Sequence, residues 1–171
     1  MNDLVYTYAK LSDALRLSLL FQTVYVQTYG DEGITFETTN YLTQRFSVAH
    51  IEKTIQKDPS QLIVAYKHNN PIGVAELYYN SVCPIRQIPI CELDKFYVMR
   101  QFHGHGIGYG LLKAAESEVR AKGHGQLFLQ VYDQNPKAIA FYKRQGYTII
   151  GEADFAMEAH TYVNFVMTKV L

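Results

Sequence analysis

The sequence predicts one mixed α/β domain, of the α+β kind, over residues 1–171, with a twisted sheet of six to seven strands and helices on both faces. Stretches that alternate like strands are interspersed with stretches of helical periodicity, which is typical of such a fold. At 171 residues the chain is long enough to bury a full core and too short for two comfortable domains. Hydrophobic residues make up 48% and charged residues 19%, as in an ordinary globular protein.

The N-terminal part is predicted to be mainly helical. Serine and threonine at a helix start accept hydrogen bonds from first-turn N–H groups, so these residues mark the expected boundaries. The predicted elements are a strand at Val5–Ala9, a helix from Ser12 to about Gln27, a short helix from Thr38 or Thr39, and a helix from Ser47 that stops before Pro59.

The remainder alternates strands and helices. The turn signal His-Asn-Asn-Pro at 68–71 separates two strands, and glycines end two helices. The predicted elements are strands at 62–66 and 72–79, a loop at 80–89, a long central strand at 90–99, a helix at 108–122, a strand at 127–131, a helix after Asn135, and an antiparallel pair at 147–150 and 162–168.

Charge and cysteine content limit the partners and the compartment. The formal net charge is zero, so no overall field attracts nucleic acid or an anionic membrane surface, and no apolar run approaches the roughly 20 residues that span a bilayer. The first residues lack a basic region and an apolar signal core. Cys83 and Cys91 have no metal-binding spacing and are expected to be free thiols, so we expect a cytoplasmic protein without a metal, and a homodimer stays open.

The run from Phe96 to Leu112 carries the strongest functional signal. An apolar strand enters a loop with glycines at 104, 106, 108 and 110, and a helical pattern follows at once. Such a loop aims backbone N–H groups and the positive end of a helix at one point, which suits a phosphate. The spacing departs from the dinucleotide fingerprint, because the third glycine position falls on Tyr109 or Leu111, and no P-loop tripeptide occurs.

A second motif follows about 30 residues later. Residues 135–147 read Asn-Pro-Lys-Ala-Ile-Ala-Phe-Tyr-Lys-Arg-Gln-Gly-Tyr. Asn135 suits a helix cap, Pro136 the first helical position and Gly146 the position after the last turn. Together the two segments resemble the GCN5-related N-acetyltransferases, whose loop reads Arg/Gln-x-x-Gly-x-Gly/Ala and whose later helix carries Asn-x-x-Ala-x-x-Phe-Tyr. The resemblance extends over nearly the whole chain in the order of its elements.

The resemblance implies a site for acetyl-CoA as co-substrate, with the pyrophosphate held mainly by backbone amides of the loop. His103 stands where the family usually has Arg or Gln, which weakens one contact without removing the site. The core for acetyl-CoA would cover residues 60–171. The implied cofactor-binding residues are Phe96, Tyr97, Val98, His103, Gly104, His105, Gly106, Ile107, Gly108, Asn135 and Tyr142.

The implied reaction is transfer of an acetyl group to a primary amine by direct attack. An alkylamine with a pKa near 10.4, about that of lysine, is protonated at pH 7, so the site must accept a proton and supply one to the leaving group. The family places a tyrosine at the position of Tyr142, which is the expected general acid. Glu92 on the central strand is the expected general base, with Glu76 or water as alternatives.

The acceptor-binding region is expected at about residues 12–58. Asp31, Glu32 and Glu37 lie there among aromatic residues and could hold an extended cation by ion pairing and cation–π contact, or they could be ordinary solvated charges. The layout resembles, more loosely, bacterial spermidine/spermine N-acetyltransferases, so the acceptor could be a polyamine such as spermidine. A protein N-terminus or lysine, an amino acid or an aminoglycoside are the alternative acceptors, and a non-catalytic acetyl-CoA-binding module is the alternative class.

Overall fold

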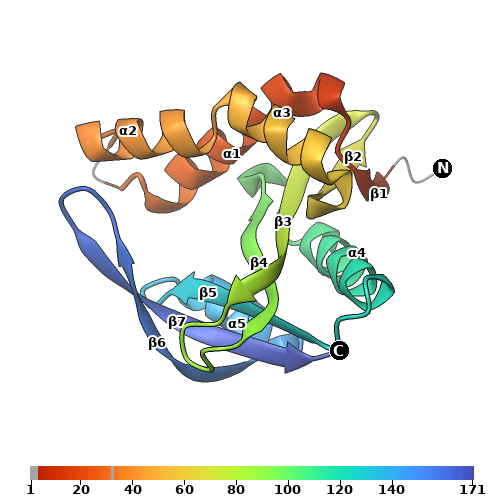
Figure 1. Cartoon of the computed structure of the whole chain (residues 1–171). Helices are drawn as coiled ribbons and strands as arrows, with labels where there is room; N and C mark the ends of the chain where they lie inside the picture. The colour runs from red at the N-terminus through yellow and green to blue at the C-terminus, as the bar shows by residue number, and fades with distance from the viewer. Residues whose placement is uncertain (1–3, 32) are drawn as a thin grey trace. The chain divides into compact units, whose positions relative to one another are not determined.

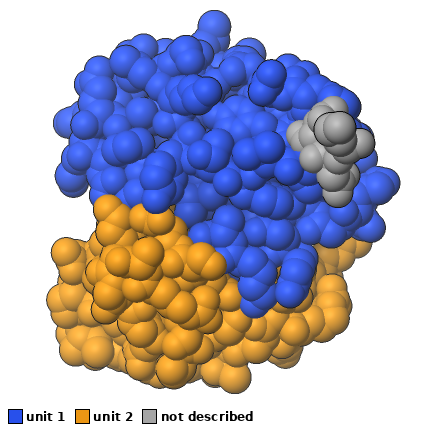
Figure 2. Space-filling model, turned by 90° about the vertical axis from the view of Figure 1, so that its right-hand side faces the viewer, with its two compact units in different colours: residues 1–76, 95–115 blue, residues 77–94, 116–171 orange. Residues whose placement is uncertain are grey.

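The computed structural model describes residues 4–31 and 33–171. The chain divides into two compact units, residues 1–76 with 95–115 (unit 1) and residues 77–94 with 116–171 (unit 2), which are coloured separately in Figure 2.

The predicted mixed sheet is confirmed. Within the described residues it has seven strands in the order β1-β2-β3-β4-β5-β7-β6 (Figure 1). Strands β4 and β5 are parallel, whereas β1 with β2, β2 with β3, β5 with β7 and β6 with β7 are antiparallel. The elements are β1 (Leu4–Tyr8), α1 (Ala14–Tyr29), α2 (Phe36–Arg45), α3 (Val48–Lys57), β2 (Leu62–Lys67), β3 (Asn70–Val82), β4 (Pro89–Val98), α4 (Ile107–Ala121), β5 (Gln126–Tyr132), α5 (Pro136–Arg144), β6 (Thr148–Ala156) and β7 (Thr161–Val170).

Unit 1 has helices on both faces of its strands. Helices α1, α2 and α3 share one core with β2 and β3, in which Val74 of β3 is fully buried. The preceding residue, Gly73, faces the other way, because a Cβ there would come within 3.5 Å of Leu111 on α4. Successive residues of a strand point to opposite faces, so α4 covers the face opposite to α1, α2 and α3.

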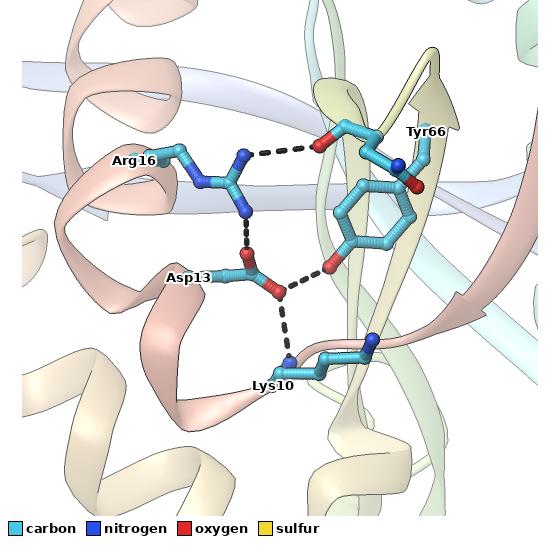
Figure 3. A network of polar contacts seen from close by, with 5 residues as sticks. Lys10, Asp13, Arg16 and Tyr66 are labelled. Atoms are coloured by element: carbon cyan, nitrogen blue, oxygen red, sulfur yellow. Dashed lines mark hydrogen bonds and ion pairs between the residues drawn. The ribbon is translucent and has the colours of Figure 1, made fainter.

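A buried carboxylate joins the start of α1 to strand β2. Asp13 is 1% exposed and accepts hydrogen bonds from the Tyr66 hydroxyl (2.5 Å) and the Lys10 backbone N–H (3.1 Å). It also pairs with the Arg16 guanidinium, which donates in turn to the Asn69 carbonyl oxygen at 3.0 Å (Figure 3). This network fixes the first turn of α1 against the β2–β3 hairpin.

The prediction that Ser12 caps the first helix is wrong. Leu11–Asp13 form a 3-10 turn, and α1 begins at Ala14. The carboxylate of Asp13, one residue after the predicted cap, takes up the Lys10 N–H ahead of the helix, so the helix start follows the buried acid and not the exposed serine.

The two other predicted starts differ in outcome. Ser47 caps α3 as predicted, accepting from the His50 backbone N–H at 3.2 Å. Helix α2 is capped by Thr35, whose hydroxyl accepts from the Thr38 N–H at 3.1 Å, and not by Thr38 or Thr39. Leu42 is the buried residue of α2, so this helix has too little apolar periodicity to locate its start.

Unit 2 is built on the antiparallel pairs β5–β7 and β7–β6, which confirms the predicted C-terminal pair. Both strands extend beyond the predicted ranges, β6 to Ala156 and β7 from Thr161 to Val170. A core cluster joins the β3–β4 connection to this sheet and consists of Cys83, Ile90, Phe128 and Val166.

Strand β6 contains a register shift between Ile149 and Gly151. A Cβ at Gly151 would come within 2.7 Å of Cδ1 of Ile85. The glycine therefore lets the β3–β4 loop lie directly on the irregular part of the strand. Within residues 4–31 and 33–171, no helix is both long and apolar enough to cross a bilayer.

Candidate active site

The loop between β4 and α4 has an accessible backbone. It contains a 3-10 turn at Arg100–Phe102 and ends where α4 begins, at Ile107. Gly104 and Gly106 have φ angles of 79° and 77°, a left-handed conformation that residues with a Cβ rarely adopt. Apart from chain neighbours, none of the described residues places a heavy atom within 4 Å of where a Cβ would lie at either glycine. A large ligand can therefore approach this backbone closely.

The other two glycines of the alternating run belong to α4, which begins one residue before the predicted start at Gly108. A Cβ at Gly110 would collide with the Tyr6 hydroxyl of β1, which donates to the Ile107 carbonyl oxygen at 3.3 Å. Gly110 is thus required for packing between β1 and α4, whereas Gly104 and Gly106 shape the loop.

The electrostatics of the loop favour an anion. The N–H groups of the first turn of a helix have no partner within that helix and carry its positive end. The first turn of α4 contains no acidic residue that would neutralise this charge. The open glycines and the helix start together fit a pyrophosphate group.

His103 is held at the base of the loop. Its Nε2 lies 2.7 Å from the Val98 carbonyl oxygen. Because a carbonyl only accepts, Nε2 is the ring nitrogen that donates in this contact. His105 is exposed in the same turn.

The end of β4 offers its backbone more than its side chains. The Tyr97 ring meets Phe21 and Phe46 edge-on, with ring centroids 5.9 and 6.4 Å apart. Val98 is 8% exposed, and Phe96 is partly buried. The side chain of Tyr97 therefore belongs to the core beneath α1, so its contribution to a ligand site would come from the main chain.

Tyr142 lies on α5, in unit 2. Asn135 caps this helix as predicted, because its side-chain oxygen accepts from the Ala138 backbone N–H at 3.2 Å. Tyr142 is 7% exposed, and its ring contacts those of Phe141 and Tyr147, with centroids 5.3 and 5.7 Å away. The phenol is thus confined to a narrow range of positions.

The two carboxylates considered as general base have different surroundings. Glu92 on β4 is partly buried and accepts a hydrogen bond from the Gln130 side-chain amide of β5 at 3.2 Å. Glu76 on β3 is 2% exposed and forms an ion pair with Arg45 at 2.7 Å. Glu76 is therefore engaged by a guanidinium, and Glu92 by at least one side-chain amide.

Arg45 was not singled out by the sequence as a partner of Glu76. It also donates to Nε2 of His50 at 3.1 Å, and its guanidinium lies 5.3 Å from the centre of the Phe46 ring. Arg45 thereby ties the end of α2 to α3 and β3. It lies 31 residues from Glu76, and no local spacing signals a pair at that separation.

Two of the three predicted acceptor carboxylates, Asp31 and Glu37, lie in the described part of the chain. Asp31 is exposed in the turn after α1, and Glu37 lies in the first turn of α2, where its charge favours the helix dipole. Glu32 lies outside the described residues. Among the residues that are described, no group of three or more His, Cys, Asp or Glu is placed to hold a metal ion.

Sequence comparisons match residues 27–147 to the acetyltransferase (GNAT) family. An uncharacterized N-acetyltransferase of Methanocaldococcus jannaschii is 25% identical over 112 residues, which cover 66% of this chain and 50% of that relative. The chain thus spans half the length of this relative. The thialysine N-epsilon-acetyltransferase of Mus musculus is 37% identical over 62 residues, or 36% of each chain.

The fold has close counterparts among solved structures. The PaiA N-acetyltransferase from Thermoplasma acidophilum, crystallised in complex with coenzyme A, superposes with a TM-score of 0.80 over 98% of this chain and 99% of that one, at 20% sequence identity. This likeness concerns the fold. The family match over most of the sequence establishes that the chain belongs to the GNAT family of acetyltransferases.

Proposed function

We propose that this protein is an N-acetyltransferase that moves the acetyl group of acetyl-CoA to a primary amine by direct attack. The observation that carries the proposal is the pair of left-handed, unobstructed glycines, Gly104 and Gly106, immediately before the start of α4. Family membership and the coenzyme A bound by the Thermoplasma protein support the choice of ligand.

In this proposal the loop binds the pyrophosphate through backbone N–H groups, and His103 lies beside it. Acetyl-CoA supplies an acetyl group activated as a thioester. Glu92, which accepts a hydrogen bond from the Gln130 amide, takes a proton from the attacking amine. Water or Glu76 is the alternative base. The Tyr142 hydroxyl supplies a proton to the departing sulfur. Cys83 and Cys91 are free and buried. Free thiols are typical of a reducing compartment, so we propose a cytoplasmic protein. It would act as a monomer or a homodimer.

The first test is ligand-dependent stability. Acetyl-CoA should raise the melting temperature in a concentration-dependent manner, because a ligand that binds only the folded chain stabilises it. NAD and ATP at the same concentration should not. Gly106→Val should remove the acetyl-CoA shift, since the side chain would fill the approach to the loop and strain the backbone.

Gly33→Val is the matched control, because Gly33 also has a positive φ (90°) and open surroundings but lies outside the loop. It should carry the same backbone strain and keep the acetyl-CoA shift. Equal stabilisation by ATP, or loss of the shift in both variants, would contradict the assignment of the loop.

For the acceptor, we propose a polyamine such as spermidine. Asp31 is exposed. Glu37, in the first turn of α2, is half-exposed and follows directly after Phe36, whose aromatic ring is exposed. Carboxylates can pair with ammonium groups, and an aromatic face can attract a further cation. The mouse relative is named for acetylating thialysine, which supports a small amine as the acceptor class.

The second test compares acceptors. Spermidine should give a higher kcat/KM than a monoamine of similar length, and the advantage should shrink as salt is added, because screening acts over about 8–10 Å. Combined removal of charge at Asp31, Glu32 and Glu37 should raise the KM for spermidine and leave that for acetyl-CoA unchanged. If the kcat/KM for spermidine is no higher than that for the monoamine, the polyamine proposal fails, and amino acids, aminoglycosides and peptides are then tested as acceptors. A protein that turns over no amine at all would be a binding module and not an enzyme.

A further inference from the structure

The end of helix α5 that bears Tyr142 is closed by a tight C-terminal turn. Gly146, with a φ of 88°, donates its N–H to the Lys143 carbonyl oxygen at 3.0 Å, and the Tyr147 N–H donates to the Tyr142 carbonyl oxygen at 3.1 Å. This is the Schellman arrangement. Tyr147 therefore holds Tyr142 twice, through the backbone bond and through the ring contact at 5.7 Å.

Tyr147 is in turn fixed from behind by a buried ion pair. Its hydroxyl donates to Oε1 of Glu116 on α4 at 3.3 Å, and Nζ of Lys169 on β7 lies 2.6 Å from the same oxygen. The ammonium of Lys169 is also 5.5 Å from the centre of the Tyr147 ring. Three elements, α4, β7 and the turn after α5, thus meet at one side chain.

Burial makes this network stiff. Glu116 is fully buried and Tyr147 is 2% exposed. Burial, and after it the Glu116 carboxylate, raise the pKa of Tyr147, so its hydroxyl stays protonated and continues to donate. Separating Lys169 from Glu116 would leave a buried charge without its counter-ion, which strongly destabilises a folded protein. The two side chains are therefore held together.

We infer that Tyr147, Glu116 and Lys169 form a positioning network that holds the phenol of Tyr142 in place for proton transfer. The inference rests on the proposed function, in which Tyr142 is the general acid. None of the three touches the reacting atoms in this scheme; each acts through Tyr142. Displacing a catalytic group by about 1 Å can cost on the order of 100-fold in rate, so the position of this ring matters.

The chain contains a matched control network in unit 1. Tyr66 is also a buried tyrosine whose hydroxyl donates to a buried carboxylate, Asp13, that pairs with a cation, Arg16 (Figure 3). The chemistry of the two networks is therefore the same, but Tyr66 belongs to the other unit. Tyr66→Phe tests for general effects of losing such a hydroxyl.

The experiment is a double-mutant cycle on kcat and on the KM for acetyl-CoA. Lys169→Met and Tyr147→Phe are each combined with Tyr142→Phe, and Lys169→Arg serves as the conservative replacement. Lys169→Met should lower kcat by about 5- to 100-fold, which lies within the range of couplings inside one network, and Lys169→Arg should recover most of the loss. In the Tyr142→Phe background, Lys169→Met should lower kcat by less than about twofold. The KM for acetyl-CoA should stay constant throughout.

Each outcome decides a separate question. If Lys169→Met and Tyr147→Phe slow the Tyr142→Phe enzyme by the same factor as the parent, the network does not act through Tyr142 and the inference is overturned. Tyr66→Phe should show no coupling to Tyr142→Phe, and coupling there of equal size would also overturn it. If Tyr142→Phe alone leaves kcat unchanged, the proposed general acid is wrong, and the inference fails with it.

A spectroscopic measurement covers variants that turn over too slowly to assay. In protein labelled with 13C at the tyrosine Cζ, the Tyr142 signal is identified by its loss in Tyr142→Phe. Tyr147→Phe, which removes a single hydroxyl and should fold, ought to shift or broaden this signal, and Tyr66→Phe ought to leave it unchanged. An unaltered Tyr142 signal in Tyr147→Phe and Lys169→Met would contradict the inference without reference to activity.

Discussion

Tyr142 is only 7% exposed, although its proposed role requires its hydroxyl to reach the sulfur of a cofactor. Its ring is bounded by Phe141 and Tyr147, so the orientation of the phenol is set before any ligand binds. A group held in this way needs little reorganisation during the reaction. Glu92 accepts a hydrogen bond from the Gln130 amide at 3.2 Å.

Tyr142→Phe should lower kcat by about 100-fold or more, the range expected for loss of a general acid, with little change in affinity for acetyl-CoA. Steady-state kinetics and a binding titration measure the two quantities. Tyr132→Phe is the control, because it also removes one phenol hydroxyl in unit 2, from a β5 residue whose recorded ring contact is with Tyr162. This control should reduce kcat much less, and equal losses in both variants would count against Tyr142.

Glu92→Gln should suppress the acidic limb of the pH–rate profile, because the amide cannot accept the proton of the attacking amine. The profile of kcat/KM against pH, measured for the parent and the variant, tests this. A profile that keeps its acidic limb in Glu92→Gln would transfer the role to water or to Glu76, and Glu76→Gln would then separate these two.

At the scale of single elements, helix ends show what a sequence reveals. The caps at Ser47 and Asn135 were predicted because each precedes a clear helical pattern and has its N–H partner three residues ahead. The starts of α1 and α2 were mispredicted, because α1 follows the buried carboxylate of Asp13 and α2 has little apolar periodicity. A start that depends on a tertiary contact, such as Tyr66 with Asp13, has no local signal.

The C-terminal end of α4 offers a test of backbone conformation. Gly123 has a φ of 83°, and its N–H and that of His124 close the last turn on Arg120 and Val119. Gly123→Ala should destabilise the protein by about 1 kcal/mol, the cost of a left-handed residue with a Cβ. In a chain of this length that corresponds to about 2–4 °C in Tm.

Gly125→Ala is the matched control, two residues away in equally open surroundings but without a positive φ. Its Tm should match or slightly exceed that of the parent, since alanine restricts the unfolded chain. A loss of Tm in Gly125→Ala as large as that in Gly123→Ala would show that the connection to β5, and not the conformation of Gly123, is sensitive.

At the scale of the whole molecule, the Asp13 network should make stability depend on acid. Burial alone would raise the pKa of the Asp13 carboxyl, but the hydrogen bonds from Tyr66 and Lys10 and the charge of Arg16 outweigh it and hold that pKa below its ordinary value. A carboxyl whose pKa is lowered by folding stabilises the native state above its unfolded pKa, about 3.9, and loses this contribution as the pH falls further.

Asp13→Asn should therefore lower the free energy of unfolding most clearly at about pH 6–7, with the deficit relative to the parent shrinking below about pH 4. Chemical denaturation across this range measures the difference. Asp154→Asn, at an exposed position of β6, should show a small difference at every pH. A deficit for Asp13→Asn that is constant with pH would mean that packing, and not charge, accounts for it.

The sequence predicted the type of fold and the two motif segments of the molecule, because both depend on local patterns: alternation, glycine spacing and capping residues. It did not predict the buried ion pairs. Glu116 with Lys169 and Arg45 with Glu76 join residues 53 and 31 positions apart, and nothing in their local sequence distinguishes them from surface charges. Each pair forms only when folding brings its two residues together and buries them, so it has no local signal.

The irregular strand β6 also bears on how copies of this protein meet. It is the last strand in the order of the sheet, and its bulge lies between Ile149 and Gly151. Glu152 and Asp154 follow, both exposed. An edge that is kinked and carries like charges on alternate residues is a poor template for adding a strand from another molecule. This edge is thereby disfavoured for edge-to-edge pairing between molecules.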